Sequence, residues 1–208
     1  MNYAELTANI QRICESTFEA SELAMFTRQA EQKIYNTIDL PAQRFNVTGN
    51  MTGNNKYLST PQSFLYIYSM AVVNNGVYEY LLNKDVNFIR EAYPTPYATG
   101  VPKHYAIFDQ DTLIVGPTPN QSFLVELHYS AYPQSIVTAG TTWLGDNFDS
   151  ALLNGALIEA QRFLKGEPDI IANYEKLYLQ AITLIKQLSD GKLRQDMYRS
   201  GQPRVKVS

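Results

Sequence analysis

The amino-acid sequence predicts an α+β fold, in which both ends of the chain form an antiparallel helical bundle and the middle forms an inserted antiparallel β-sandwich or barrel. Three observations predict it. Apolar residues recur at helical spacing before residue 41 and after residue 143. Between these regions, short apolar runs alternate with polar residues and are separated by Gly, Pro and Asn, which is typical of antiparallel strands. A chain of 208 residues is also long enough to bury a substantial core.

Residues 1–41 predict the first two helices of the bundle. Leu6, Ile10 and Ile13 have helical spacing in the first of them. We expect Ser21 to cap the second helix and Pro41 to end it. The apolar positions of this second helix form a single face, namely Leu23, Phe26, Ala30, Ile34 and Ile38.

Residues 42–142 predict the β-rich insert. Its first part, Ala42 to Thr60, is polar and rich in Gly and Asn, so we expect an exposed loop or a loose hairpin there. The segment from Phe64 to Leu82 predicts two strands around Asn74-Asn75-Gly76, because Asn-Gly is a strong hairpin signal. A short helix is expected from Lys84 to Ala92.

Three more strands are predicted in the rest of the insert. Tyr105–Phe108 and Thr112–Val115 flank a polar turn that contains Asp109 and Asp111. From Phe123 to Tyr129, apolar and other residues alternate almost strictly, which indicates a sheet with one buried face. The insert should therefore contain about five to six strands, enough for a small sandwich or barrel.

Residues 143–190 predict a helical hairpin that completes the bundle. Gly166 and Pro168 separate its two helices, and Asp146 and Asp149 are candidate caps before the first of them. The expected apolar positions of the two helices are Leu153, Ala156, Leu157, Ala160 and Leu164, followed by Ile171, Tyr174, Leu177, Tyr178, Ala181, Ile185 and Leu188.

Residues 191–208 differ from the rest of the chain in charge. Five basic residues and one acidic residue give this segment a net charge of +4, which leaves −7 on residues 1–190 because the whole chain carries −3. A basic segment that contains Gly and Pro beside an acidic body predicts an extended arm that seeks an acidic partner surface.

The sequence contains little that suggests catalysis. It has no Gly-rich phosphate-binding loop, and its two histidines, His104 and His128, lie on predicted strands without a partner at metal-ligand spacing. Asp109 and Asp111 are best explained as turn formers, although a metal at this pair is the one enzymatic alternative. Cys14 is the only cysteine and is expected to be a small buried apolar residue. We therefore expect a protein that is not an enzyme and needs no cofactor or metal.

Membrane and nucleic-acid binding are also not expected. The N-terminus lacks the features of a signal peptide, and no apolar run approaches the ~20 residues that cross a bilayer, so we expect a chain made in the cytoplasm that does not bind membranes. The acidic body repels phosphates, which argues against sequence-specific binding of DNA.

The order of motifs between residues 100 and 144 resembles that of the head-to-tail adaptor proteins of short-tailed bacteriophages. The motifs are G-x-P-x-x-Y-A-I, a hairpin, L-x-x-x-P-x-P, V-x-L-x-Y-x-x-x-P and T-x-W-L. They lie at Gly100, Pro102, Tyr105, Ala106, Ile107, Leu113, Pro117, Pro119, Val125, Leu127, Tyr129, Pro133, Thr141, Trp143 and Leu144. The helical flanks agree in kind, so the resemblance covers roughly Tyr3 to Leu188.

The resemblance implies a structural protein of the virion that is assembled in the host cytoplasm. It implies a ring of identical copies, twelve in number, that joins the portal protein to the tail tube or nozzle and leaves a channel through which DNA passes. In that setting the basic arm would bind the portal. The residues expected to do so are Arg194, Tyr198, Arg199, Arg204 and Lys206.

Two other classes of function remain open from the sequence. One is a different virion component, such as a tail completion or gatekeeper protein. The other is a carbohydrate- or protein-binding module that uses the tyrosines of the insert, since the chain contains 15 Tyr residues.

Overall fold

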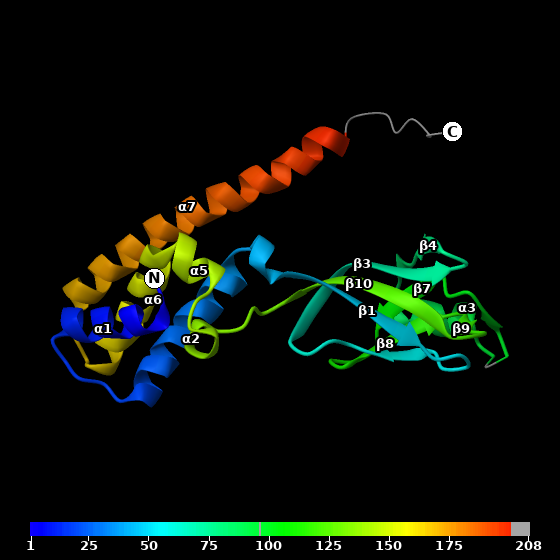
Figure 1. Ribbon diagram of the computed structural model, residues 1–208, viewed down its shortest axis with the longest axis horizontal. Coiled ribbons are helices and arrows are strands. Elements are labelled where there is room, and N and C mark those ends of the chain that lie inside the picture. The colour runs from blue at the N-terminus through cyan, green and yellow to red at the C-terminus, as the bar shows by residue number, and fades with distance from the viewer. Residues whose placement is uncertain (96, 201–208) are drawn as a thin grey trace. The chain divides into compact units, whose positions relative to one another are not determined.

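The computed structural model describes residues 1–95 and 97–200, and the side chains of these residues as far as Ser189. The chain forms two compact units (Figure 1). The helical unit consists of Met1–Ala42 and Pro133–Ser208, and the β unit consists of Gln43–Tyr132. The fold is α+β and its sheets are mainly antiparallel, as the sequence predicted. Two short strand pairs are parallel, namely Leu82–Asn83 with His104–Tyr105 and Thr99–Gly100 with Thr118–Pro119.

In the part of the helical unit that ends at residue 200, the structure has two helices from the start of the chain and four from its end. They are α1 (Tyr3–Cys14), α2 (Ala20–Thr37), α4 (Ile136–Ala139), α5 (Trp143–Asn147), α6 (Asp149–Phe163) and α7 (Pro168–Ser200). The short 3-10 helix η1 (Pro41–Gln43) follows α2. Because α4 lies in this unit, residues 133–142 belong to the helical part and not to the β insert, where we had expected them.

Side-chain and backbone hydrogen bonds fix where these helices begin. At α1, the backbone N–H of Glu5 donates to Asn2 Oδ1 at 2.9 Å, and the Glu5 carboxylate accepts from the backbone N–H of Asn2 at 3.0 Å. At α2, the N–H of Glu19 donates to the carboxylate of Glu22 at 2.8 Å. Ser21 therefore lies inside α2 and does not cap it, contrary to our expectation.

The predicted caps Asp146 and Asp149 were also wrong. Thr142 caps α5, since its hydroxyl accepts from the N–H of Gly145 at 3.2 Å. Asp146 lies in the first turn of α5 and Asp149 in the first turn of α6. Carboxylates there are still favoured by the helix dipole, which explains why both positions resembled caps in the sequence.

Helix α6 is the centre of the helical unit and packs against α1, α2 and α7. The predicted apolar face of α2 is buried throughout, and so are Ala156, Leu157 and Ala160 of α6. One predicted apolar position of α1 and one of α6 were assigned wrongly, because Ile13 at the end of α1 and Leu164 at the end of α6 are exposed. Both lie in the last turn or just after it, where fewer neighbouring elements remain to cover them.

Over residues 43–95 and 97–132, the β unit forms ten strands in three sheets. The strands are β1 (Arg44–Met51), β2 (Tyr57–Ser59), β3 (Phe64–Asn74), β4 (Val77–Tyr80), β5 (Leu82–Asn83), β6 (Thr99–Gly100), β7 (His104–Ile107), β8 (Thr112–Gly116), β9 (Thr118–Pro119) and β10 (Phe123–Ala131). Two sheets have four strands each, in the orders β1-β10-β3-β4 and β2-β8-β7-β5, and β6 pairs with β9.

The exposed loop or loose hairpin expected from Ala42 to Thr60 was wrong, because this segment contains β1 and β2, which pair with β10 and β8 and not with each other. Strand β1 pairs with β10 without interruption from Arg44–Ser130 to Met51–Phe123. Its partner lies about 80 residues later in the chain, and most of its side chains are exposed. A strand whose side chains are exposed needs no alternating apolar pattern, and here its pairing partner is distant in the sequence. The local sequence of β1 therefore did not predict a strand.

The two predicted hairpins and the alternation of the last strand were correct. Between β3 and β4, Asn75 and Gly76 both have positive φ, 50° and 80°, which matches the turn type that Asn-Gly favours. Strands β7 and β8 pair on either side of the turn at Asp109–Asp111. In β10, Phe123, Val125, Leu127 and Tyr129 point into the core.

The core of the β unit lies between the two four-stranded sheets. Its buried residues come from both sheets and from the segments that join their strands: Met51, Met70, Val72, Leu81, Tyr105, Leu113, Val115, Phe123, Val125, Leu127, Tyr129 and Ala131. On the outside of the second sheet, α3 (Val86–Ala92) buries Ile89 against Ala106 and Ile114. The sequence had placed this helix at Lys84–Ala92.

Helix α7 continues beyond the point where we expected an extended arm. It runs without a break from Pro168 to Ser200, so the backbone of residues 191–200 is helical. Residues 201–208, including the remainder of the expected arm, lie outside the described residues.

Candidate functional site

Three of the five predicted portal-binding residues lie on the last turns of α7. Arg194, Tyr198 and Arg199 share this helix, so a single continuous element carries them (Figure 1). Arg204 and Lys206 lie outside the described residues. The structure therefore places three of the five residues on one helix. Their role in binding the portal stays a prediction.

Helix α7 is held in the helical unit as far as Ser189. Ala181, Ile182 and Ile185 are buried, and the Ser189 hydroxyl donates to the backbone carbonyl of Asp39 at 2.6 Å. This hydrogen bond joins α7 to the segment that follows α2. The basic part of α7 thus begins shortly after the last residue with a described tertiary hydrogen bond.

A stripe of exposed apolar side chains runs along α7 beside its buried face. Its members follow heptad-like spacing and are Ile170, Leu177, Leu184 and Leu188. Leu184 is 61% exposed. The sequence had assigned Leu177 and Leu188 to the core-facing side. Apolar positions on two adjacent faces of one helix cannot be told apart from a single wide apolar stripe in the sequence. Only the packing of α6 against α7 shows which of the two faces is buried.

The outer face of the first sheet carries an aromatic cluster. The Tyr66 and Tyr68 hydroxyls lie 3.2 Å apart, and the ring of Tyr68 lies 4.9 Å from that of His128. The Arg44 guanidinium lies over the Tyr68 ring at 4.9 Å. Sequence analysis noted the abundance of tyrosine but did not predict that these side chains would gather on one face. That grouping depends on the pairing of β1, β10 and β3.

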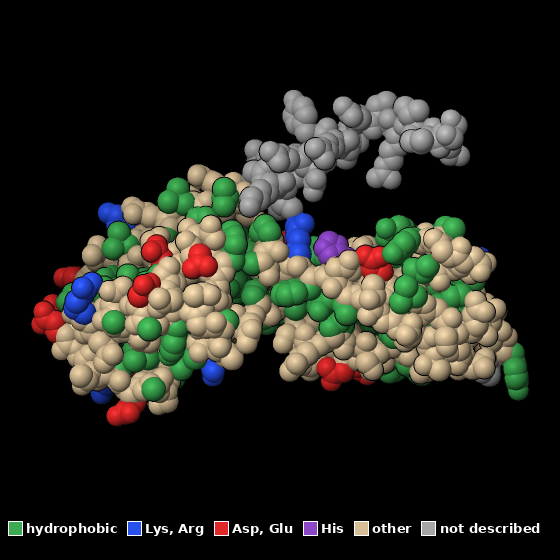
Figure 2. Space-filling model, in the orientation of Figure 1, with side chains coloured by type: hydrophobic (Ala, Val, Ile, Leu, Met, Phe, Trp, Pro, Cys, Tyr) green, Lys and Arg blue, Asp and Glu red, His purple; other side chains and the backbone are tan. Residues whose placement is uncertain are grey.

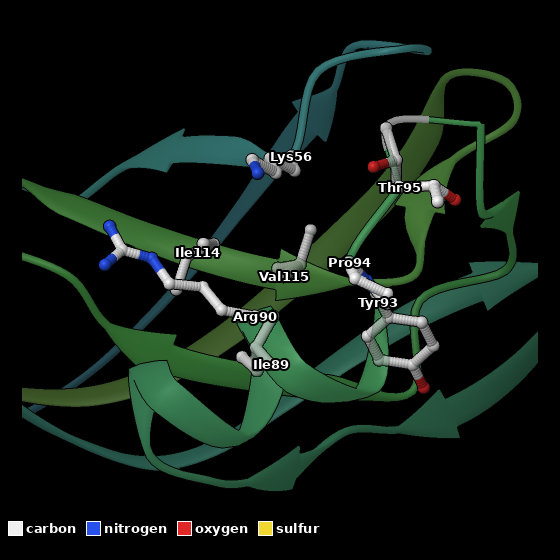
Figure 3. Close-up of a pocket in the computed structure, with 9 residues that line it drawn as sticks. Lys56, Ile89, Arg90, Tyr93, Pro94, Thr95, Ile114 and Val115 are labelled. Carbon is white, nitrogen blue, oxygen red and sulfur yellow. The ribbon is translucent and has the colours of Figure 1, made fainter.

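Figure 3 shows a small pocket beside α3, with a volume of about 110 Å³. Its lining includes Lys56, Arg90, Tyr93 and Thr95. Lys56 lies 5.5 Å from the Tyr57 ring and Arg90 lies 5.5 Å from the Phe108 ring. Among the described residues, neither cation forms an ion pair with a carboxylate. The pocket is thus small and mildly basic, and none of the residues that line it is Asp, Glu, His or Cys.

The residues that could suggest catalysis have structural roles. His104 Nδ1 lies 3.0 Å from the Tyr93 hydroxyl, and burial, with Lys84 and Lys103 nearby, lowers the pKa of His104. Asp109 accepts a hydrogen bond from the N–H of Asp111 at 2.9 Å, as a turn former does. Cys14 is partly buried, and its sulfur accepts from Gln161 at 3.5 Å. Over residues 1–95 and 97–189, no three His, Cys, Asp or Glu side chains gather as metal ligands would.

Glu31, the most deeply buried carboxylate among the side chains described as far as Ser189, joins two helices. Its side chain accepts from the backbone N–H of Ile136 at 2.8 Å, so it ties α2 to the start of α4. Burial raises the pKa of Glu31, while its hydrogen bonds to Ile136 and Ser135 partly oppose that change. Glu31 was not singled out in the sequence, since nothing in its local pattern distinguishes it from an exposed helical glutamate.

Exposed apolar and aromatic side chains occur on both units (Figure 2). Such surfaces are typical of proteins that assemble with others. None of the helices that the structure describes has the length and hydrophobicity to cross a bilayer.

Comparison with known proteins gives the family. The model of the SU10 adaptor protein family matches residues 1–205, so the chain belongs to that family and is a phage adaptor protein. A search of curated proteins found no match to this chain. The family agrees with the resemblance to phage head-to-tail adaptors that the motifs between residues 100 and 144 had indicated.

Proposed function

We propose that this protein forms a ring in the virion that joins the portal protein to the tail and encloses part of the channel through which DNA leaves the head. The family match over residues 1–205 carries this proposal. The proposed role is structural and involves no catalysis. Twelve copies is the number that the adaptor resemblance implies.

The charge distribution supports a channel through which DNA can pass. Residues 1–42 and 133–190 contain 13 acidic and seven basic residues, a net charge of −6, and residues 43–132 contain six acidic and five basic residues, a net charge of −1. Neither of these two sets of residues carries a net positive charge that would attract phosphates, and each phosphate contact would retard a moving duplex. A channel wall formed by either set of residues would therefore not hold the DNA by its phosphates.

We propose that the basic end of the chain binds the portal. The residues involved would be Arg194, Tyr198 and Arg199 on α7, together with Arg204 and Lys206. A ring presents the same contact many times, so each copy needs to contribute only weak binding for the whole ring to stay attached. The long helix supports the proposal because Arg194, Tyr198 and Arg199 all lie on its continuous backbone.

Electron microscopy of the protein mixed with its portal ring tests the proposal, with a sample that lacks the portal as control. We expect an additional ring under the portal with matching symmetry. Binding to the tail tube but not to the portal would instead indicate a gatekeeper or tail completion protein.

A pair of charge variants tests which residues bind. The double variant Arg194→Glu and Arg199→Glu should lose portal binding. The matched control, Lys176→Glu with Lys186→Glu, changes the charge of α7 by the same amount at two exposed positions and should bind as the wild type does. Truncation at Gly191 should leave the fold intact and abolish binding. Unchanged binding by the truncated chain would refute the role of this segment.

A further inference from the structure

Strand β1 differs from the other edge strands of the β unit in length. The two four-stranded sheets have four edges, formed by β1, β4, β2 and β5. These strands have eight, four, three and two residues respectively. Natural proteins keep edge strands short to prevent pairing with other chains. Only β1 is long.

The edge at β1 also lacks the other protective features. After Arg44 the strand contains no charged residue and no proline, and its pairing with β10 has no bulge. Six consecutive residues, 45–50, are exposed. Among the described residues only β10 pairs with β1, so its second edge offers backbone N–H and C=O groups to a further strand.

The opposite edge of the same sheet, β4, is unusually apolar. Val77 is 63% exposed and Tyr80 is 69% exposed, and Tyr78 between them is also exposed. The only charged side chain of β4, Glu79, accepts a hydrogen bond from Asn74 at 2.8 Å. Exposed apolar residues on a sheet edge are costly in a monomer and are typical of an interface.

We propose that β1 of one copy pairs with β4 of the next copy, so that the sheet continues from one protomer to another. The proposal rests on the proposed ring and names the contact between its copies. All pairs in the order β1-β10-β3-β4 are antiparallel, so β1 and β4 run in opposite directions. Copies placed side by side in the same orientation therefore continue the antiparallel order. Joining two different edges is a head-to-tail contact, the kind from which rings are built.

The side chains of the two edges match in this arrangement. Val47 is paired with Leu127 and so lies on the core side of the sheet. Glu79 is paired with Val72, which is buried in the core, so Glu79 lies on the core side of β4. Val77 is two residues from Glu79 and therefore lies on the same side. The register that sets Val77 opposite Val47 also sets Tyr80 opposite Arg44, whose guanidinium already lies over Tyr68. Val47 and Val77 then meet on the core side, where Glu79 lies opposite Phe45, and Tyr80 extends the aromatic row on the outer side.

Cysteine crosslinking between two single variants tests the pairing. Val47→Cys and Val77→Cys would each be made in a Cys14→Ala background, mixed in equal amounts and oxidised, alone and with the portal ring. Gly49→Cys replaces Val47→Cys to detect a register shifted by two residues. Native mass spectrometry of the same samples records whether copies associate. We expect a disulfide between the two different variants and none within either variant alone.

A second variant tests the edge without any crosslink. Val47→Lys places a charge on the core side of the edge and should weaken association between copies at least tenfold, whereas the control Thr183→Lys, at an exposed position of α7, should not. Copies that associate without the mixed disulfide, or that crosslink only through Val47→Cys pairs, would overturn the inference while leaving the adaptor ring intact. Copies that do not associate even with the portal would overturn both.

Discussion

The hydroxyl of Ser189 donates a 2.6 Å hydrogen bond to the backbone carbonyl of Asp39, a residue 150 positions earlier in the chain. Ser189 is buried, and Ile185 one turn before it is fully buried. The bond fixes α7 against the segment after α2 just before the basic residues begin. The direction in which the basic end of α7 leaves the helical unit therefore depends on this contact.

Replacement of Ser189 by alanine should destabilise the protein by about 1 kcal/mol, the usual net contribution of one buried hydrogen bond. Chemical denaturation measures this change in the free energy of unfolding. Thr183→Ala is the matched control, because its hydroxyl is exposed and bonds only the Leu179 carbonyl of its own helix. The control should change stability by less than about 0.5 kcal/mol. Equal effects would show that the Ser189 contact contributes nothing specific.

Glu31 should make stability depend on pH. Its pKa is raised by burial above the ordinary value of 4.5, so the folded protein holds a proton there more tightly than the unfolded chain does. The stabilisation by this proton is complete below about pH 4.5 and is lost as the pH rises through the folded-state pKa. Glu31→Gln keeps an oxygen to accept from Ile136 and removes the charge.

The variant should therefore gain stability relative to the wild type as the pH rises from 4.5 toward neutrality. Thermal unfolding of both proteins over this range measures the difference. Glu91→Gln, at an exposed position of α3, is the control and should not show this gain. A constant difference between Glu31→Gln and the wild type at all pH values would contradict the assigned cause.

Gly116 should not tolerate a side chain. A Cβ atom there would lie 2.5 and 2.7 Å from two ring carbons of Tyr93 and 3.0 Å from Ile89, both of which pack from the α3 region. Gly116→Ala should cost about 1–3 kcal/mol, as overpacking of a core does. Gly49→Ala, where nothing lies within 4 Å, should change stability by less than about 1 kcal/mol. Comparable losses at both sites in a denaturation experiment would argue against the close approach of Tyr93.

The two faces of β10 should respond differently to truncation. Leu127 is buried between the sheets, so Leu127→Ala should cost about 2–5 kcal/mol. Leu124 lies on the outer face of the same strand and is 42% exposed. Leu124→Ala should cost less than about 1 kcal/mol. Similar midpoints of urea denaturation for the two variants would mean that the alternation does not define the buried face.

Local sequence was enough to predict the elements whose stability comes from neighbouring residues. The apolar face of α2, the Asn75-Gly76 turn and the alternation of β10 each depend on spacing or backbone preference within a few residues. The α+β fold class and the family followed from the order of such elements along the chain. The charge reversal near the C-terminus was likewise a property of composition alone.

Tertiary structure alone decided the features that depend on distant partners. Strand β1 exists because β10 pairs with it, and its polar, Gly-containing sequence indicated a loop. The packing of α6 determined which face of α7 is buried and left the stripe at Leu177, Leu184 and Leu188 exposed. Edge position, burial and the environment of Glu31 are properties of a neighbourhood in space. Such a neighbourhood cannot be predicted from local sequence, because most of the free energy of burial comes from contacts between residues far apart in the chain.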